Sequence, residues 1–342
     1  MDRIDVIAVV GSCVPERQGY AARLAALTHR ILIPASRLEA TPDPVEEAVM
    51  LAPWCAHPAG VVIEFPTASS MIDIVGAFAD EGGSTRLSGI VGVVDAAHLL
   101  ADLARDDYST HPALTRVAGR AVAHALQFVH QIEFSSMIVL STWEAMSTRD
   151  LSTAMALISH LSPFARLRVD HGGELGWRAG EPYTPQQVRP GWVALINSAH
   201  DPHMTDPRVS AFRYESFRPL HPERLARLLD ERIEPGEFGT VIRSVGFCRF
   251  ATRPHMVAEW NHVGGMISFD PLARDDALGE DDELLALGQD IGVIGLDLDR
   301  DALVRALDEV VLTNSELAAG IGEWIRYPDP FPAWQTVAED VE

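Results

Sequence analysis

Short apolar runs alternate with helical patterns along the first half of the chain. The apolar runs, rich in Val and Ile, occupy residues 4–10, 31–34, 60–66, 89–94 and 136–141. Helical spacing of apolar positions follows at residues 19–29, 69–80, 95–104, 112–131 and 148–161. Continuous β-branched strands separated by helices are typical of a parallel sheet buried on both faces. The pattern predicts an α/β, doubly wound parallel sheet over residues 1–168.

The pattern changes after residue 168. Residues 169–207 are rich in Gly, Pro and polar positions, which predicts a linker or extended loop. Strands are then expected at residues 209–217, 240–252, 255–269 and 291–298, and helices at residues 221–233, 299–312 and 314–325. Asp299 and Asn314 are expected to cap the last two helices. We therefore predict a smaller α+β domain over residues 208–334 and a tail at 335–342.

Composition narrows the class of partner. The 342 residues are 47% hydrophobic and 22% charged, enough to bury ordinary cores. The formal net charge is −22, with 49 acidic and 27 basic residues, so we expect no free nucleic acid as a partner. Every basic residue is Arg, so no lysine exists to bind a phosphate or form a Schiff base. Codon bias and selection against lysine modification both remain open as reasons.

Cysteine usage and hydropathy indicate the compartment. Cys13, Cys55 and Cys248 lie far apart and form no CxxC pair, which fits a reducing cytoplasm. No apolar run approaches the length of a spanning helix, and the opening MDRIDVIAVV is too short and too acidic for a signal peptide. We expect a cytoplasmic protein with no membrane partner.

Ordered motifs in the second half carry a family resemblance. They are RPLHPERLARLLDE, GTVIRSVGFCRFATRP, WNHVGG, IGVIGLDLDRDALVRALDEVVLTNSEL and DPFPAW, and they cover about residues 212–334. The set resembles the C-terminal domain of the CobW family of P-loop GTPases and metallochaperones. The first half is similar in plan, through GIVGVVDAAHLLADL, QIEFSSMIVLSTWEAM and SPFARL. The resemblance implies a P-loop-GTPase-like sheet followed by a CobW-type C-terminal domain.

The chain departs from the family at the phosphate-binding loop. Family members carry GxxxxGK[ST], but the register from Gly11 puts Glu16, Arg17 and Gln18 where Gly, Lys and Ser/Thr belong. Using Gly19 instead gives no better match. Three interpretations stay open: a GTPase, which the missing cation and Mg²⁺ ligand disfavour, weak nucleotide binding without turnover, and a structural turn at Gly11. No catalytic residue is assigned.

The guanine-reading motif is altered as well. The family's Asn-Lys-x-Asp becomes STWE at residues 141–144, where Glu144 alone keeps a carboxylate. The resemblance therefore implies four nucleotide-binding candidates, which are Gly11, Arg17, Gly19 and Glu144.

Metal ligands are sparse. The family's Cys-x-Cys-Cys segment is absent, and Cys55 with His57 supplies two ligands at most, below the four of a structural zinc site. His200 and His203, near acidic residues in a polar loop, are weak candidates for a transition metal, although such histidines are usually just solvated. We assign no metal site.

Four other residues have two interpretations each. Asp95 either serves a nucleotide site or, as we favour, caps the next helix. Cys248, His255 and His262 either converge on one site or, as we favour, are a core cysteine and two surface histidines.

We predict a CobW-like protein with decayed GTPase and metal motifs that acts as a non-catalytic adaptor or regulator. The resemblance implies zinc homeostasis as the setting and a protein partner, one form being a ribosome-associated factor acting under zinc limitation. No cofactor is required, with weak GTP or Zn binding left open. The alternative is a GTP-dependent metallochaperone, and thus a GTP hydrolase, in which Arg17 replaces the lysine and His200 and His203 replace the thiols.

Overall fold

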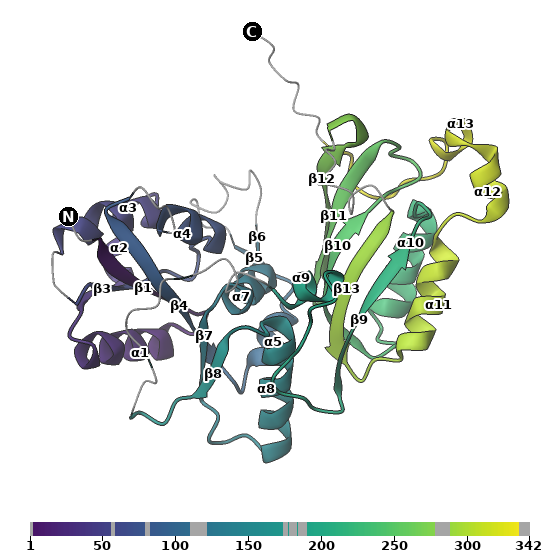
Figure 1. The fold of residues 1–342 in the computed structure, drawn as a ribbon. Helices are drawn as coiled ribbons and strands as arrows, with labels where there is room; N and C mark the ends of the chain where they lie inside the picture. The colour runs from purple at the N-terminus through teal and green to yellow at the C-terminus, as the bar shows by residue number, and fades with distance from the viewer. Residues whose placement is uncertain are drawn as a thin grey trace, which may run out of the picture. The chain divides into compact units, whose positions relative to one another are not determined.

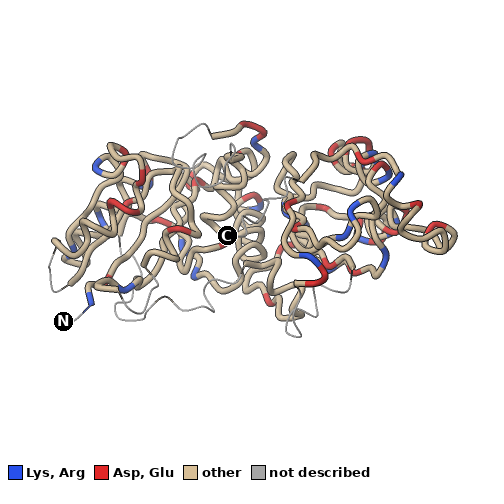
Figure 2. Tube along the Cα trace, turned by 90° about the horizontal axis from the view of Figure 1, so that it is seen from above, with Lys and Arg blue, Asp and Glu red and all other residues tan. Residues whose placement is uncertain are grey.

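The computed structural model describes residues 3–55, 59–78, 83–109, 122–173, 177, 183, 190–277 and 288–334. The chain divides into two compact units (Figure 1). The first comprises Met1–Gly191 and His200–Asp206, and the second comprises Trp192–Ala199 and Pro207–Glu342. Within the described residues, every helix is too short or too polar to cross a membrane. Acidic and basic positions are interspersed along the traces of both units (Figure 2).

The first unit contains a six-stranded parallel sheet, as predicted. Its order is β2-β3-β1-β4-β7-β8, and the bounds are β1 Ile4–Val10, β2 Ile31–Ile33, β3 Val61–Glu64, β4 Thr85–Asp95, β7 Met137–Ser141 and β8 Arg166–Val169. The chain leaves β1 toward β3 on one side and later returns to β4 on the other. The carboxyl ends of β1 and β4 therefore form a topological switch point, where sheets of this kind bind ligands.

Helices cover both faces of this sheet. They are α1 Val14–Leu27, α2 Ala35–Leu38, α3 Pro44–Leu51, α4 Met71–Phe78, α5 Leu99–Leu103, α7 His124–Glu133 and α8 Thr148–Leu161, with a 3₁₀ turn, η1, at Ala52–Trp54. Ile7 and Val9 of β1 share a core with Leu24 of α1, whereas Val6 and Ala8 share another with α3 and α4. Both sets of alternate side chains are buried, which explains the unbroken apolar run.

Three elements differ from the sequence expectation. α1 begins at Val14, five residues before the expected start, because Pro15 suits the first helical turn. Residues 122–123 form β6 Val122–Ala123, paired with β5 Tyr108–Ser109, so the expected helix at 112–131 is observed only as α7. Residues 112–121 lie outside the described part of the chain. The expected linker contains a short helix, α9 Gly191–Ile196.

The second unit is the expected smaller α+β domain. Its antiparallel sheet has the order β12-β11-β10-β13-β9, with β9 Val209–Ser216, β10 Thr240–Cys248, β11 Met256–Val263, β12 Met266–Arg274 and β13 Gln289–Leu296. Packed against its core are α10 Pro222–Leu228, the π-helical turn η3 Leu229–Ile233 and α11 Arg300–Val310 (Figure 1).

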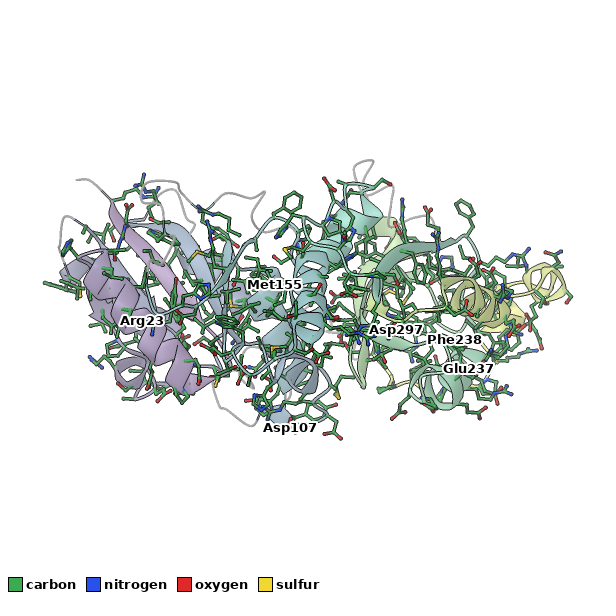
Figure 3. All side chains as sticks on the ribbon, turned by 90° about the horizontal axis from the view of Figure 1, so that it is seen from below. Arg23, Asp107, Met155, Glu237, Phe238 and Asp297 are labelled. Carbon is green, nitrogen blue, oxygen red and sulfur yellow. The ribbon has the colours of Figure 1, made fainter. Side chains whose placement is uncertain are left out.

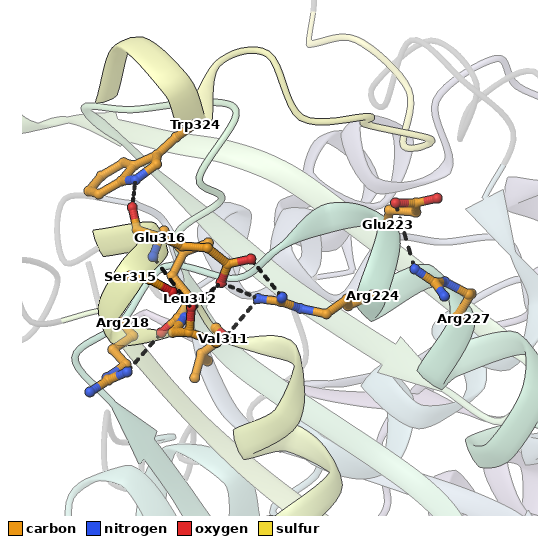
Figure 4. A network of polar contacts seen from close by, with 10 residues as sticks. Arg218, Glu223, Arg224, Arg227, Val311, Leu312, Ser315, Glu316 and Trp324 are labelled. Atoms are coloured by element: carbon orange, nitrogen blue, oxygen red, sulfur yellow. Dashed lines mark hydrogen bonds and ion pairs between the residues drawn. The ribbon is translucent and has the colours of Figure 1, made fainter. Parts of the chain in front are cut away.

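The last expected helix is two helices. α12 Asn314–Ala319 and α13 Ile321–Trp324 are separated by Gly320, whose φ of 79° is in the left-handed region that glycine tolerates. The cap is Thr313, one residue before the expected Asn314, in a capping box with Glu316. Glu316 also accepts two hydrogen bonds from Arg224, at 2.9 and 3.0 Å, which ties α12 to α10 (Figure 4).

Candidate functional site

The connection between β1 and α1 is only three residues long. A Cβ atom at Gly11 would lie 2.4 Å from the carbonyl oxygen of Val93, so the strand crossing requires glycine there. Because α1 begins at Val14, both Arg17 and Gly19 lie within the helix. Neither residue belongs to a loop that presents backbone N–H groups to a phosphate.

Arg17 is fully buried and bound to the protein itself. Its Nε donates to Glu64 Oε1 at 3.0 Å, and its Nη1 donates to the Gly11 carbonyl oxygen and to Thr67 Oγ1, both at 2.7 Å. The second carboxylate oxygen of Glu64 accepts from the Ala35 N–H at 3.1 Å. The charge in the lysine position is thus neutralised by the glutamate at the end of β3.

Carboxylates gather at the N-terminus of α1. The Cys13 thiol donates to the Glu16 carboxylate, and burial, followed by Glu16 and Asp95, raises the pKa of Cys13 to about 12. A helix N-terminus attracts anions, but here a phosphate would meet acidic side chains. The described residues of this edge therefore do not fit Mg·GTP.

Asp95 joins the ends of β4 and β7. Its carboxylate accepts from the Thr142 hydroxyl and from the Ala97 N–H at 3.1 Å, and it lies 2.7 Å from His98 Nδ1. Burial raises the pKa of Asp95, but the hydrogen bonds from Thr142 and His98 outweigh it and hold that pKa below its usual value. Asp95 thus caps the turn before α5, whose own N-cap is His98.

The STWE segment begins at the buried last residue of β7, Ser141, and continues into the turn that follows the strand. Glu144 is exposed, and its neighbour Trp143 donates from Nε1 to the Asp170 carbonyl oxygen at 2.9 Å. Trp143 also meets His171 edge-on, with ring centroids 5.0 Å apart. Glu144 follows β7, whereas Gly11, Arg17 and Gly19 follow β1. Nucleotide binding by these four residues stays a prediction.

The two weak metal candidates bind different groups. His200 Nε2 lies 3.1 Å from the His160 carbonyl oxygen, and His203 Nδ1 lies 3.0 Å from Ser159 Oγ. The rings of His160 and His200 are 5.1 Å apart, and burial lowers the pKa of both. Across the described residues, no group of three or more His, Cys, Asp or Glu side chains is arranged to hold a metal ion. His57 lies outside these residues.

Cys248, His255 and His262 occupy separate positions in the second unit. Cys248 is buried at the end of β10, and His255 is exposed beside Asp275, both as expected. His262 was expected at the surface, but it is buried and burial lowers its pKa to about 4. On β11 it follows Trp260 by two residues, so both side chains face the covered side of the sheet.

Sequence reasoning missed a polar cavity of about 120 Å³ at the switch-point edge of the first unit. Its described lining includes Ser12, Thr67, Asp102, Gln127 and Gln131. The available signal was a pair of glutamines four residues apart in α7, on a face otherwise filled by apolar side chains.

Comparison with known proteins identifies the second unit. Residues 209–311 match the family model of the cobalamin synthesis protein cobW C-terminal domain. Zinc-regulated GTPase metalloprotein activator 1 of Dictyostelium discoideum is 29% identical over 139 residues, which are 39% of this chain and 29% of that protein. The chain therefore matches less than a third of that relative's length.

Two solved structures are also similar. The Zn(II)-bound YjiA GTPase from E. coli is 13% identical, with a TM-score of 0.39, and a Zn(II)-bound triple mutant of YjiA GTPase is 14% identical, with a TM-score of 0.38. Each comparison covers 91% of this chain and 100% of the other. TM-scores at this level do not establish a common fold. What the comparisons establish is therefore a domain of the cobW C-terminal type at residues 209–311.

Proposed function

We propose that this CobW-family protein is a non-catalytic adaptor or regulator in zinc homeostasis, which binds a protein partner and does not hydrolyse GTP. The zinc setting comes from the matched relative, which is named as a zinc-regulated GTPase metalloprotein activator. The observation that carries the non-catalytic role is the buried ion pair of Arg17 with Glu64.

Phosphoryl transfer depends on cations positioned against the transferred group. In this chain the residue at the lysine position is 0% exposed and already pairs with a carboxylate. Moving the Arg17 guanidinium away from Glu64 would leave that carboxylate buried without its partner, at a cost of about 3–5 kcal/mol. Among the described residues, Nη2 of Arg17 has no hydrogen-bond partner, whereas Nε and Nη1 are bound. Cys13, Glu16 and Asp95 add no cation at the start of α1.

The alternative of a GTP-dependent metallochaperone needs free ligands. It requires Arg17 to bind phosphate and the two histidines His200 and His203 to bind one metal ion. Instead, Arg17 contacts Glu64. His200 contacts the His160 carbonyl oxygen, and His203 contacts Ser159. These contacts favour the adaptor.

Calorimetric titration of the full chain with Mg·GTP and Mg·ATP, together with a phosphate-release assay, tests the absence of GTPase activity. We expect no binding heat at millimolar nucleotide and no released phosphate. Micromolar binding to the wild type that disappears in the Arg17→Met/Glu64→Met variant, with its melting temperature retained, would overturn the proposal. The double variant is the informative one because it removes the cation without leaving a buried charge unpaired.

The adaptor role is tested by density-gradient sedimentation of native lysates, with and without a zinc chelator. We expect the chain to sediment with a partner when zinc is scarce, and to do so whether or not GTP is added. Movement into ribosomal fractions would identify the ribosome as the partner. Sedimentation as a free chain in both conditions would contradict the adaptor role. Because the chain has no lysine, a carboxyl-reactive crosslinker is needed to trap the complex.

A further inference from the structure

The cavity beside α7 has a composition unlike that of a nucleotide site. Its wall is formed by the loops after β1 and β3, by α5 and the residues after it, and by one face of α7, all within the first unit. The described lining includes none of the four nucleotide candidates. It lies where doubly wound sheets bind ligands. Its described lining combines four neutral polar side chains with Phe128 and with the titratable Asp102, Arg105 and His124.

The charged groups around the cavity already have partners. Arg105 donates to both carboxylate oxygens of Asp107, at 2.8 and 2.6 Å, and His124 Nδ1 lies 3.0 Å from the same group, which Figure 3 labels. Asp102 accepts from Ser12 Oγ at 3.3 Å, and burial raises the pKa of its carboxyl. An anion would have to displace Asp107 from Arg105 and approach Asp102. The electrostatics favour a neutral ligand.

Two buried amide atoms on α7 lack partners among the described residues. Gln131 is 3% exposed, and its Nε2 donates to the Thr67 carbonyl oxygen at 3.2 Å, so its Oε1 is an acceptor with no donor. Gln127 is 8% exposed, and its Nε2 is a donor with no acceptor. Residues four apart on a helix lie on one face. Each unpaired buried polar atom costs about 1–3 kcal/mol, which a matching ligand would recover.

A donor and an acceptor on one face match a ligand group that has both an acceptor and a donor. A lactam or carboxamide edge is such a group. Phe128, 2% exposed, adds an apolar aromatic surface to the lining. The cavity, at about 120 Å³, is of the same order as one of about 150 Å³ that holds benzene, so its volume limits the ligand to a single small ring.

We propose that this cavity binds a neutral, single-ring lactam or carboxamide, held by Gln127 and Gln131 and packed on Phe128. This site is separate from the adaptor role and does not depend on it. Pyrimidine bases belong to this ligand class, and uracil is the simplest probe of it.

Ligand-observed NMR of the full chain with uracil tests the proposal. We expect saturation transfer to uracil, and much less to 1,3-dimethyluracil, which has the same ring but no N–H donor. Gln127→Met is expected to weaken binding about tenfold without lowering the melting temperature, since it removes an unpaired buried amide. Orthophosphate is expected not to compete.

Three outcomes would overturn the proposal. The first is no saturation transfer to uracil at millimolar concentration, which would mean that the cavity holds water only. The second is equal transfer to uracil and to 1,3-dimethyluracil. The third is unchanged uracil binding by the Gln127→Met variant. Competition by orthophosphate would instead identify an anion site. Gln131→Met serves as a second variant, expected to weaken binding as well but also to lower stability, because it breaks the bond to Thr67.

Discussion

The switch-point edge of the parallel sheet and the helix-covered face of the antiparallel sheet differ in how completely they are filled. The first has a cavity of about 120 Å³ with unpaired amide atoms at its wall. The second has only about 20 Å³, lined chiefly by apolar side chains, and there Trp260 Nε1 donates to Ser244 Oγ at 2.8 Å. Among the described residues, the switch-point edge therefore has room for a ligand, whereas the helix-covered face of the antiparallel sheet is closely packed.

Each unit also buries one arginine, and the partners differ. Arg17 is 0% exposed and pairs with a carboxylate, whereas Arg243 is 1% exposed and its Nη1 donates to Asn261 Oδ1 at 2.6 Å and to the His262 carbonyl oxygen at 3.2 Å. Removing Arg17 therefore leaves the Glu64 carboxylate buried without its cation. Stability in the first unit should depend strongly on this single ion pair.

The largest expected effect comes from Arg17→Met. It should destabilise the first unit by about 3–5 kcal/mol in urea unfolding, because Glu64 stays buried without its cation. Arg17→Met/Glu64→Met should recover a large part of that loss. Arg23→Met is the matched control on the same helix, where Figure 3 labels Arg23. Arg23 is 38% exposed and pairs with Asp170, so its removal should cost at most about 1 kcal/mol. Equal costs for the two single variants would contradict the comparison.

Acid should weaken both units through buried histidines, His160 in the first and His262 in the second among them. Burial lowers the pKa of His160 and of His262 to about 4, so each is neutral in the folded protein where the unfolded chain binds a proton. Stability should therefore fall as pH drops from 6.5 to 4, by up to about 3 kcal/mol per histidine. Hydrogen exchange resolved by unit measures this. His160→Gln should flatten the pH dependence of the first unit alone, and an unchanged slope would count against the assignment.

Gly11 in the β1–α1 connection and Gly19 inside α1 should respond to alanine substitution in opposite directions. Gly11→Ala should destabilise by about 1–3 kcal/mol, because the new Cβ would meet the Val93 carbonyl oxygen. Gly19→Ala should stabilise the protein by about 0.5–1 kcal/mol, because residue 19 lies inside α1. A Cβ atom added there would have ordinary contact, 3.8 Å from Arg23 Nη1. Thermal unfolding distinguishes the two, and a stable Gly11→Ala protein would show that the strand crossing is looser than described.

The smallest expected effect is local to α12 and α13. The Arg224 hydrogen bonds lower the pKa of Glu316 to about 2, so the pair stabilises these helices above the unfolded pKa of about 4.5 and is lost as pH falls through about 2. Glu316→Gln should cost about 1 kcal/mol at neutral pH and increase hydrogen exchange in α12. Glu323→Gln, at an exposed pair with Arg326, is the control and should change nothing measurable. Similar hydrogen exchange of α12 in the Glu316→Gln and Glu323→Gln variants would show that the Arg224–Glu316 pair does not stabilise α12.

The sequence predicted the strands best, because residues buried on both sheet faces form unbroken apolar runs. The expected strand at residues 4–10 and the expected helix at 148–161 coincide with β1 and α8. The predicted start of α1 was wrong because the family motif predicted a loop at residues where the helix begins, at Val14 and Pro15. The Arg17–Glu64 pair joins residues 47 positions apart, and the cavity joins four separate elements. Local patterns do not encode such contacts.

The buried Arg17–Glu64 pair gives the switch-point edge a built-in counter-ion. A loop that is ordered by a bound nucleotide changes with the ratio of GTP to GDP, and it loosens when competing salt screens the phosphate. Here the counter-ion is covalently part of the chain, at full occupancy and shielded from solvent. The proposed adaptor would therefore keep the geometry of this edge whatever the energy charge of the cell.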